Sequence, residues 1–172
     1  FSEVYLRYGV QRTVAFKAGA HCPPDLKTLA AQYFDEQGLL KPEGFQTFPD
    51  FVKQAQATSQ DVRIYEDALG FVAQVRDKSA LAERIDTLIP HGPSSPLCEK
   101  LVSVSLYPYQ REGVLFAAKA GRCLLADDMG LGKALQAIAA TELLAQAVGV
   151  ERVLVVAPTS LKHQWKQEIA RF

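Results

Sequence analysis

The sequence has 172 residues, of which 48% are hydrophobic and 22% are charged, and its 19 basic and 19 acidic residues give a formal net charge of zero. This length suits one domain with its own core, or a small domain with part of a second. The composition is that of an ordinary globular protein and has no excess of lysine or arginine, so any nucleic-acid partner must be inferred from motifs. No apolar run approaches the roughly 20 residues of a membrane-spanning helix, and we expect no membrane partner.

The chain contains three scattered cysteines, Cys22, Cys98 and Cys123. An odd, scattered set favours reduced thiols in a cytoplasmic protein over a disulfide framework. No paired spacing of Cys and His residues predicts a zinc site. The chain also begins without a methionine and ends within a helical pattern, so we expect it to be a piece of a longer protein.

Residues 1–97 are predicted to form a mostly helical domain. Alternating apolar residues on both sides of Gly9 favour two short strands at its start. Apolar residues at helical spacing then predict four helices, over residues 24–34, 48–55, 64–75 and 79–89. Ser79 is the expected N-cap of the last of them. The aromatic residues of this region lie at core-facing positions, and nothing in it indicates catalysis.

A cluster of Pro, Gly and Ser at residues 90–96 predicts a linker, and we place the domain boundary between residues 97 and 98. The region beyond it predicts a helix from Pro108 to Gly121 and further elements in alternation. These are a strand at 123–126, a helix at 132–147, a strand at 153–156 and a helix at 161–172 capped by Ser160. Strands that are apolar on both faces and alternate with helices predict a parallel sheet. The expected fold class is therefore α/β, with a parallel-sheet lobe at residues 98–172.

The stretch DDMGLGKA, residues 127–134, joins a predicted strand to a predicted helix. In such a turn, backbone N–H groups and the helix N-terminus can converge on a phosphate. Gly132 and Lys133 fit the G-x-x-x-x-G-K-[ST] pattern of a nucleotide-binding loop, but Asp127 replaces its first glycine and Ala134 its hydroxyl residue. On its own this motif is a weak signal, since similar strings also occur in simple turns.

Three sequence motifs, by their order and spacing, resemble those of the Swi/Snf-like branch of the superfamily-two helicase-like ATPases. They are LYPYQREGV, DDMGLGKALQAI and VLVVAPTSLKHQW, and the resemblance covers residues 106–172. In that family the middle motif runs D-E-M-G-L-G-K-T, so Asp127 is the usual residue and Ala134 is the one serious departure. The resemblance implies a RecA-like lobe of the P-loop NTPase type, of which this chain holds the first part. The residues before it resemble at most the leaders of bacterial members, and a bacterial source is expected.

The resemblance also implies roles for individual residues. Gln110 matches the residue that reads adenine, and a carboxamide can both accept from the exocyclic amine and donate to the neighbouring ring nitrogen. Lys133 matches the catalytic lysine that contacts the outer phosphates. The remaining ATP contacts fall on Asp127, Asp128, Met129, Gly130, Leu131, Gly132 and Ala134. A DNA-backbone contact falls on Pro158, Thr159 and Ser160, at a helix start where hydroxyls and N–H groups suit phosphate. Trp165 is expected in the core, and His163 in solvent.

We therefore expect the N-terminal fragment of an ATP-dependent double-stranded DNA translocase or helicase-like ATPase. The parent hydrolyses ATP, while the fragment binds ATP and is inactive alone. Magnesium is expected only in the complete parent, because the family's acidic motif and arginines are expected beyond Phe172 and the Ala134 methyl group cannot ligate a metal. The alternative is a DNA- or protein-binding scaffold with a decayed nucleotide site. Uncovered strand edges also predict that the fragment self-associates.

Overall fold

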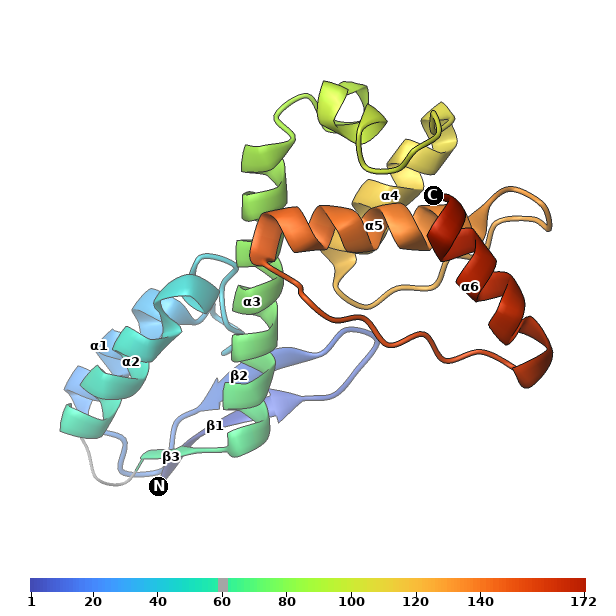
Figure 1. Cartoon of the computed structure of the whole chain (residues 1–172). Coiled ribbons are helices and arrows are strands. Elements are labelled where there is room, and N and C mark those ends of the chain that lie inside the picture. Colours follow the sequence, from blue (N-terminus) through green and yellow to red (C-terminus); the bar gives the residue numbers. More distant parts are fainter. Residues whose placement is uncertain (59–61) are drawn as a thin grey trace. The chain divides into compact units, whose positions relative to one another are not determined.

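The computed structural model describes residues 1–58 and 62–172. The chain forms two compact units, Phe1–Asp77 and Lys78–Phe172. Their division falls within helix α3 (Glu66–Leu88), shown in green in Figure 1. This structural division lies about twenty residues before the boundary expected at residues 97–98. The expected boundary stays a prediction of where the ATPase-like lobe begins.

The Phe1–Asp77 unit contains a small sheet whose strands lie in the order β2-β1-β3. β1 (Ser2–Arg7) pairs antiparallel with β2 (Thr13–Lys17) and parallel with β3 (Val62–Ile64). The two strands predicted around Gly9 are confirmed. β3 was not predicted, because the apolar Ile64 also fits the helical spacing of the residues that follow it.

Helices α1 (Pro24–Tyr33) and α2 (Gly44–Thr58) confirm two of the helices predicted for this unit. α1 begins with proline at its first position, where the missing N–H would have no helical partner. Aromatic side chains from both helices and from the residue after α1 build the centre of the core, where the Phe34 and Phe51 rings meet edge to face with centroids 5.2 Å apart. The expectation that aromatic residues form the core of this region is confirmed.

Helix α3 is continuous through residues 76–79, where a break was expected. No glycine or proline interrupts that stretch, so the helix continues across it. The predicted N-cap at Ser79 is therefore wrong. Among the residues that the structure describes, no helix combines the length and the apolar character that crossing a bilayer requires.

The Lys78–Phe172 unit consists of helices. The three helices predicted for residues 108–121, 132–147 and 161–172 are confirmed as α4 (Pro108–Ala120), α5 (Lys133–Val148) and α6 (Lys162–Arg171). The expected linker instead forms two short 3-10 turns, η1 (Gly92–Ser94) and η2 (Pro96–Glu99), because its prolines start turns that bury Ser95 and Cys98. The core combines the end of α3 with α4 and α5 through Ile85, Val114 and Leu143.

The two strands predicted for this unit are not formed. Residues 123–126 and 153–156 run as extended chain, and no strand occurs anywhere in Lys78–Phe172, all of which is described. Leu124, Leu154 and Val156 expose 82%, 87% and 88% of their surface, so the predicted burial is wrong as well. A parallel strand takes its hydrogen bonds and its cover from neighbours, and neither segment has one here. The mixed α/β class itself is confirmed, and the RecA-like sheet stays a prediction.

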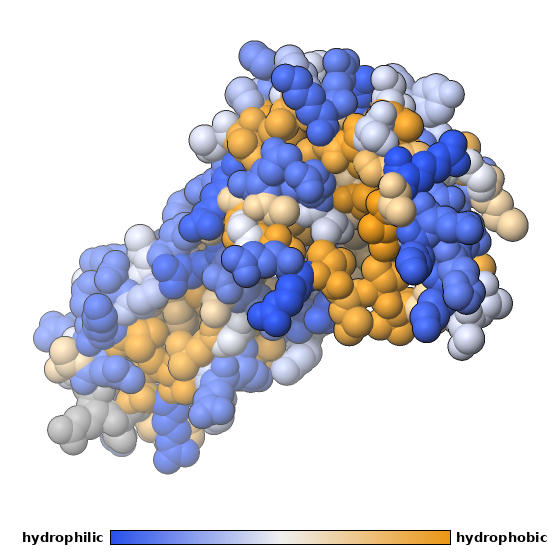
Figure 2. All heavy atoms as spheres, viewed as in Figure 1, coloured by the Kyte–Doolittle hydropathy of each residue, from blue (hydrophilic) through white to orange (hydrophobic). Residues whose placement is uncertain are grey.

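The segment at residues 153–156 contributes to an apolar area on the surface of this unit. The segment runs from α5 towards η3 (Thr159–Leu161) and α6, as the orange-red trace of Figure 1 shows. In the same view, Figure 2 shows hydrophobic atoms gathered between α5 and α6. Apolar surface of this kind is unusual for a monomeric soluble protein.

Candidate functional site

The glycine loop, residues 127–132, connects residues 123–126 to the start of α5. Gly130 and Gly132 have φ values of +85° and +79°, in the left-handed region that favours glycine. A Cβ atom on Gly132 would lie 2.6 Å from Gln110 Nε2, so a larger residue there would displace the Gln110 carboxamide. Because Gly132 immediately precedes α5, the N–H groups of the first helical turn are directed at the loop. The backbone therefore has the form that an anion-binding turn requires.

Lys133 is the first residue of α5, and its ammonium group turns back onto the glycine loop. Its Nζ donates to the carbonyl oxygen of Asp127 at 2.7 Å and to that of Asp128 at 2.9 Å. Both acceptors are neutral carbonyl groups. A phosphate oxygen, which is charged, is a stronger acceptor for an ammonium group and can replace them. The lysine thus lies beside the loop, and its contact with the outer phosphates stays a prediction.

Gln110 lies in the first turn of α4, is only 4% exposed, and joins that helix to the glycine loop. Its Nε2 donates to the carbonyl oxygen of Leu131 at 3.0 Å, and its Oε1 accepts from the backbone N–H of Tyr107 at 3.0 Å. The Tyr109 hydroxyl donates to the same Leu131 oxygen at 3.3 Å. Both polar atoms of Gln110 are therefore engaged, and the predicted adenine contact requires that they exchange partners.

The other loop residues differ in their surroundings. Asp127 accepts a hydrogen bond from Gln136 Nε2 through its Oδ2 at 2.7 Å. Asp128 and Met129 are exposed, with Met129 at 96%. Ala134 is the second residue of α5 and presents only a methyl group.

These residues fit a phosphate ligand, but not a magnesium ion held by protein side chains alone. The loop offers glycine backbone, a helix start and a lysine, which suit phosphate oxygens. Magnesium needs oxygen ligands in an octahedral arrangement. Among the residues described, no three His, Cys, Asp or Glu side chains are grouped as a metal site would require, and Ala134 adds no oxygen.

The predicted DNA-contacting residues Pro158, Thr159 and Ser160 are exposed and lie at the start of η3 and α6. Neither helix has a side-chain capping bond, so the predicted Ser160 cap is wrong; the backbone turn of η3 leads directly into α6 instead. No hydrogen bond within the described part of the chain links these three residues to the glycine loop.

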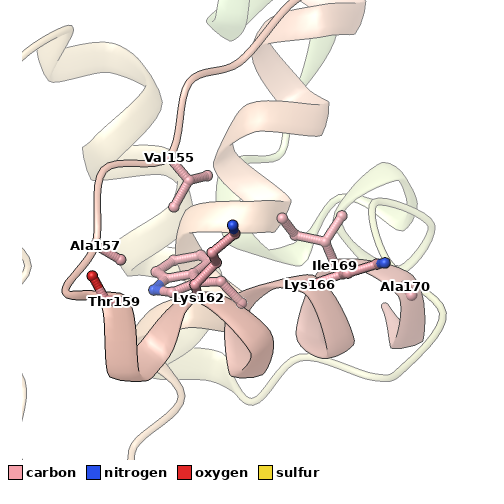
Figure 3. Close-up of a pocket in the computed structure, with 8 residues that line it drawn as sticks. Val155, Ala157, Thr159, Lys162, Lys166, Ile169 and Ala170 are labelled. Atoms are coloured by element: carbon pink, nitrogen blue, oxygen red, sulfur yellow. The ribbon is translucent and has the colours of Figure 1, made fainter.

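A cavity of about 610 Å³ lies beside these residues (Figure 3). Its polar lining is Thr159 with Lys162 and Lys166, which are one helical turn apart on α6. Its apolar lining is Val155, Ala157, Trp165, Ile169 and Ala170. Trp165 is half-buried in this wall and is not part of the unit's buried core, contrary to the prediction, because residues 153–156 do not cover α6 as a sheet would. His163 is exposed, as predicted.

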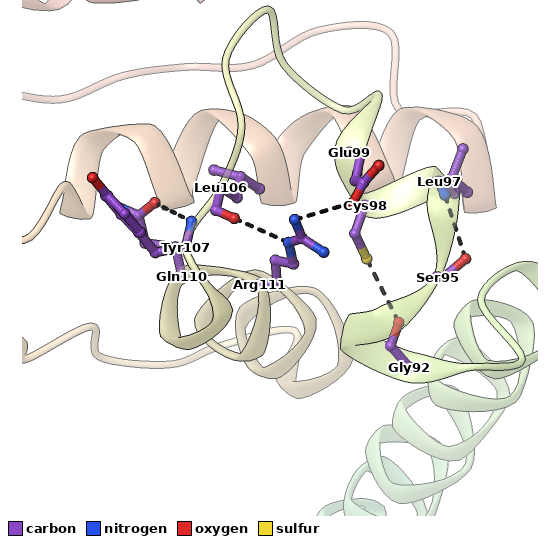
Figure 4. A network of polar contacts seen from close by, with 9 residues as sticks. All are labelled: Gly92, Ser95, Leu97, Cys98, Glu99, Leu106, Tyr107, Gln110 and Arg111. Carbon is purple, nitrogen blue, oxygen red and sulfur yellow. Dashed lines mark hydrogen bonds and ion pairs between the residues drawn. The ribbon is translucent and has the colours of Figure 1, made fainter.

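A polar network fixes the start of α4, on which Gln110 lies (Figure 4). Arg111 Nε donates to the carbonyl oxygen of Leu106 at 3.0 Å, and a terminal nitrogen of the same guanidinium lies 3.3 Å from Glu99 Oε1 on η2. The buried Cys98 thiol donates to the carbonyl oxygen of Gly92 at 3.7 Å. Burial raises the pKa of this thiol, the Arg111 charge opposes the shift, and the Glu99 charge adds to it. The network holds η1 and η2 against α4.

Sequence reasoning missed two residues of the site, Tyr109 and Gln136. Gln136 is fully buried and donates a hydrogen bond to Asp127, although the sequence predicted only that it lies within a helix. The sequence does contain a sign that Gln136 matters. Gln136 is a polar residue among Leu135, Ile138 and Ala139, on the side of α5 that faces the core. A buried polar side chain within an apolar stripe needs a partner, and here the partner is the loop.

Residues 109–172 match the SNF2-related domain. That range contains Gln110, the glycine loop, Lys133 and residues 158–160. The match supports the expected Swi/Snf-like, helicase-like ATPase fragment. No solved structure matches this chain.

Several curated proteins are similar to the chain. A Bos taurus SWI/SNF-related matrix-associated actin-dependent regulator of chromatin subfamily A-like protein 1 is 46% identical over 103 residues, which cover 59% of this chain and 10% of that protein. The human DNA annealing helicase and endonuclease ZRANB3 is 43% identical over 68 residues, covering 39% of this chain and 6% of that protein. The Bos taurus DNA excision repair protein ERCC-6-like is 30% identical over 162 residues, covering 81% of this chain and 13% of that protein.

The chain thus spans about a tenth of the length of these relatives. Their names describe proteins that act on DNA or chromatin, which supports a helicase-like, DNA-dependent ATPase fragment. All three come from mammals, so they give no support to the expected bacterial source.

Proposed function

We propose that the chain is the ATP-binding start of an ATP-dependent double-stranded DNA translocase. The observation that carries this proposal is the junction of three predicted elements: Gln110 bonds the glycine loop, and Lys133 at the start of α5 bonds the same loop. The match of residues 109–172 to the SNF2-related domain includes all three. The same junction is the arrangement that a purine nucleotide with a phosphate chain needs.

In the proposed site, the phosphates of ATP lie against the glycine loop and the first turn of α5. ATP supplies the phosphoanhydride bond whose cleavage drives translocation. Lys133 leaves the carbonyl oxygens of Asp127 and Asp128 and donates to the phosphates instead. Gln110 exchanges its bonds to Tyr107 and Leu131 for the edge of adenine, which offers one donor and one acceptor to a carboxamide.

The chain by itself is proposed to bind ATP without hydrolysing it. Phosphoryl transfer requires neutralisation of the developing charge, usually by magnesium held through a loop hydroxyl and an acidic residue. Ala134 gives no hydroxyl, and no group of three or more His, Cys, Asp or Glu side chains that could hold a metal occurs among the residues described here. Magnesium is therefore a property of the complete protein in this proposal.

The proposed DNA contact lies at residues 158–160 and the adjoining face of α6. Thr159 presents a hydroxyl group to the cavity that Lys162 and Lys166 also line (Figure 3), and Ser160 follows Thr159 with a second hydroxyl group. Hydroxyls, lysines and a helix start are the groups that usually contact the DNA backbone. Contacts of this kind carry no base specificity, which suits a protein that moves along DNA.

One alternative has a specific observation in its favour. Ala134 removes the loop hydroxyl, and Lys133 and Gln110 already have partners within the protein. These features also suit a scaffold that binds DNA or another protein and has lost its nucleotide site.

Equilibrium competition against a fluorescent ATP analogue distinguishes the two functions. The ATPase proposal predicts that ATP competes at least roughly tenfold better than GTP, since guanine presents the wrong donor and acceptor to Gln110. If neither nucleotide competes at millimolar concentration while a DNA duplex still binds, the scaffold is correct.

A further inference from the structure

The side chain of Gln136 lies between the glycine loop and helix α4. It is 0% exposed, and its Nε2 donates to Asp127 Oδ2 at 2.7 Å. Its Oε1 is buried and has no hydrogen-bond partner among the residues described. A carboxamide is rarely buried with one end unpaired. Hydrogen bonding therefore fixes only one end of the Gln136 carboxamide, and packing must fix the other.

Gly113 of α4 forms the other side of this contact. A Cβ atom on Gly113 would lie 1.9 Å from Gln136 Oε1 and 3.0 Å from its Cδ, far inside van der Waals contact. The carboxamide consequently rests directly on the α4 backbone, where only glycine leaves room for it.

Asp127 stands where nucleotide-binding loops usually have a glycine. No residue other than glycine has a positive φ in the part of the chain described, so Asp127 keeps an ordinary backbone conformation. The loop is instead fixed at Asp127 from two sides. Lys133 bonds its carbonyl oxygen at 2.7 Å, and Gln136 bonds its carboxylate at 2.7 Å.

We propose that Gln136 is a positioning residue for the nucleotide loop, a latch that rests on Gly113 and holds Asp127 in the shape that receives phosphate. When ATP draws Lys133 away from the Asp127 carbonyl oxygen, the bond from Gln136 is the one that remains. The latch therefore keeps the start of the loop in place during binding. This inference rests on the proposed function only for the identity of the ligand; the latch itself is a property of the nucleotide-free loop.

Hydrogen exchange of the loop amides, measured without nucleotide, tests the latch directly. Gln136→Met keeps the length of the side chain and removes the bond to Asp127. Gly113→Ala leaves Gln136 intact and displaces its carboxamide through the added methyl group. We expect each change to speed exchange at residues 128–132 by about tenfold, the effect of losing one charge-assisted hydrogen bond. The double variant exchanges no faster than either single one, because both changes break the same contact.

Matched controls separate this effect from general loss of stability. Gln146→Met alters another glutamine of α5, which is exposed and bonds Glu142. Gly70→Ala alters a helical glycine with no atom within 4 Å of the added Cβ. Neither change should alter exchange in the loop. Thermal unfolding followed by circular dichroism shows whether each variant is folded. Equal exchange in Gln136→Met and the wild type, or additive effects in the double variant, overturns the latch.

A rescue experiment gives a result that a purely structural role does not predict. Gln136→Glu places a carboxylate against Asp127 and breaks the latch by repulsion. Adding Asp127→Asn restores the bond in the reverse direction, because the new amide at position 127 can donate to the new carboxylate at position 136. Loop exchange in this double variant returns towards that of the wild type. No recovery relative to Gln136→Glu alone contradicts the proposed pairing.

Nucleotide affinity is measured separately, by competition of ATP against a fluorescent analogue. We expect the latch variants to bind ATP about five- to tenfold more weakly than the wild type, because the loop must be ordered on binding. If the wild type binds no ATP while the exchange results hold, the proposed function fails and the latch stands. If ATP binds normally to all variants and loop exchange is unchanged, the latch fails and the proposed function stands.

Discussion

The ammonium group of Lys133 donates a hydrogen bond to the backbone carbonyl oxygen of Asp127, six residues earlier, and its Nζ lies 2.7 Å from that oxygen. The same nitrogen reaches the carbonyl oxygen of Asp128 at 2.9 Å. The ammonium group of Lys133 thus already bonds the glycine loop that precedes it. Binding of a phosphate there is an exchange of partners and not the filling of an empty space, so part of the phosphate's interaction energy offsets the loss of these two bonds.

The first prediction concerns Lys133→Met in the 172-residue chain. The methionine retains the unbranched stem and removes the positive charge, so the phosphate loses its strongest partner. We expect ATP affinity to fall by about tenfold or more, since a hydrogen bond from a charged group contributes about 1.5–3 kcal/mol. Competition against a fluorescent ATP analogue measures it. Lys100→Met, a change at an exposed lysine outside the loop, is the control and should bind ATP as the wild type does.

The second prediction concerns magnesium and Ala134. Because Ala134 gives no oxygen ligand, calorimetric titration of the chain with ATP should give nearly the same affinity with and without magnesium. Ala134→Thr supplies the hydroxyl, and ATP should then bind more tightly when magnesium is present. Ala134→Val matches the shape of threonine without its oxygen and should show no such gain. A tenfold effect of magnesium on the unaltered chain would show that another ligand acts there.

Local pattern predicted the helices of this chain, except that α3 was expected as two separate helices. An amphipathic helix forms its hydrogen bonds within its own segment, so periodicity and breakers such as Pro108 and Gly121 are enough to place it. The strand at residues 153–156 depends on neighbours that hydrogen-bond and cover it, and periodicity cannot supply them. Its apolar run predicted burial, and Leu154 and Val156 lie in solvent instead.

In the candidate site too, local sequence predicted the loop but not the contacts between distant residues. The motif predicted a glycine turn that leads directly into a helix, and Gly132 and Lys133 lie at that junction, because a loop of six residues is set by local sequence. The contact between Gln136 and Gly113 joins two helices 23 positions apart, and no local pattern encodes it. The bonds that engage both ends of Gln110 are also a tertiary result, since they depend on where the loop backbone passes α4.

The third prediction follows from the apolar area around residues 153–156 (Figure 2). Exposed valine and leucine side chains on an extended segment promote association between copies. We expect the chain to sediment as a mixture whose average mass rises with concentration. Leu154→Glu places a charge in the middle of this area and should shift the chain towards monomer.

The control for this experiment is Glu151→Gln, a change at an exposed residue of the same segment that adds no apolar surface. Its sedimentation should match that of the wild type. A wild-type chain that stays monomeric across the accessible concentration range would contradict the predicted association.

The fourth prediction concerns Cys98 and alkaline pH. Burial raises the pKa of its thiol above the usual value of about 8.5 that an unfolded chain shows, and Arg111 only partly opposes this. Above the unfolded pKa the unfolded chain therefore loses this proton while the folded chain retains it. The contribution of the Cys98 thiol to the free energy of unfolding is therefore complete below about pH 8.5 and is lost as the pH rises through the folded pKa.

Cys98→Val keeps a small apolar side chain at this buried position and removes the titration. Other groups also titrate in alkali, so the comparison between the two proteins is the informative quantity. The free energy of unfolding from urea titrations should fall more steeply above about pH 8.5 in the wild type than in Cys98→Val. Cys123→Val, at an exposed thiol, should follow the wild-type profile. Parallel profiles for the wild type and Cys98→Val would mean that the Cys98 thiol ionises as readily in the folded protein as in the unfolded chain, and that η1 and η2 open to solvent at alkaline pH.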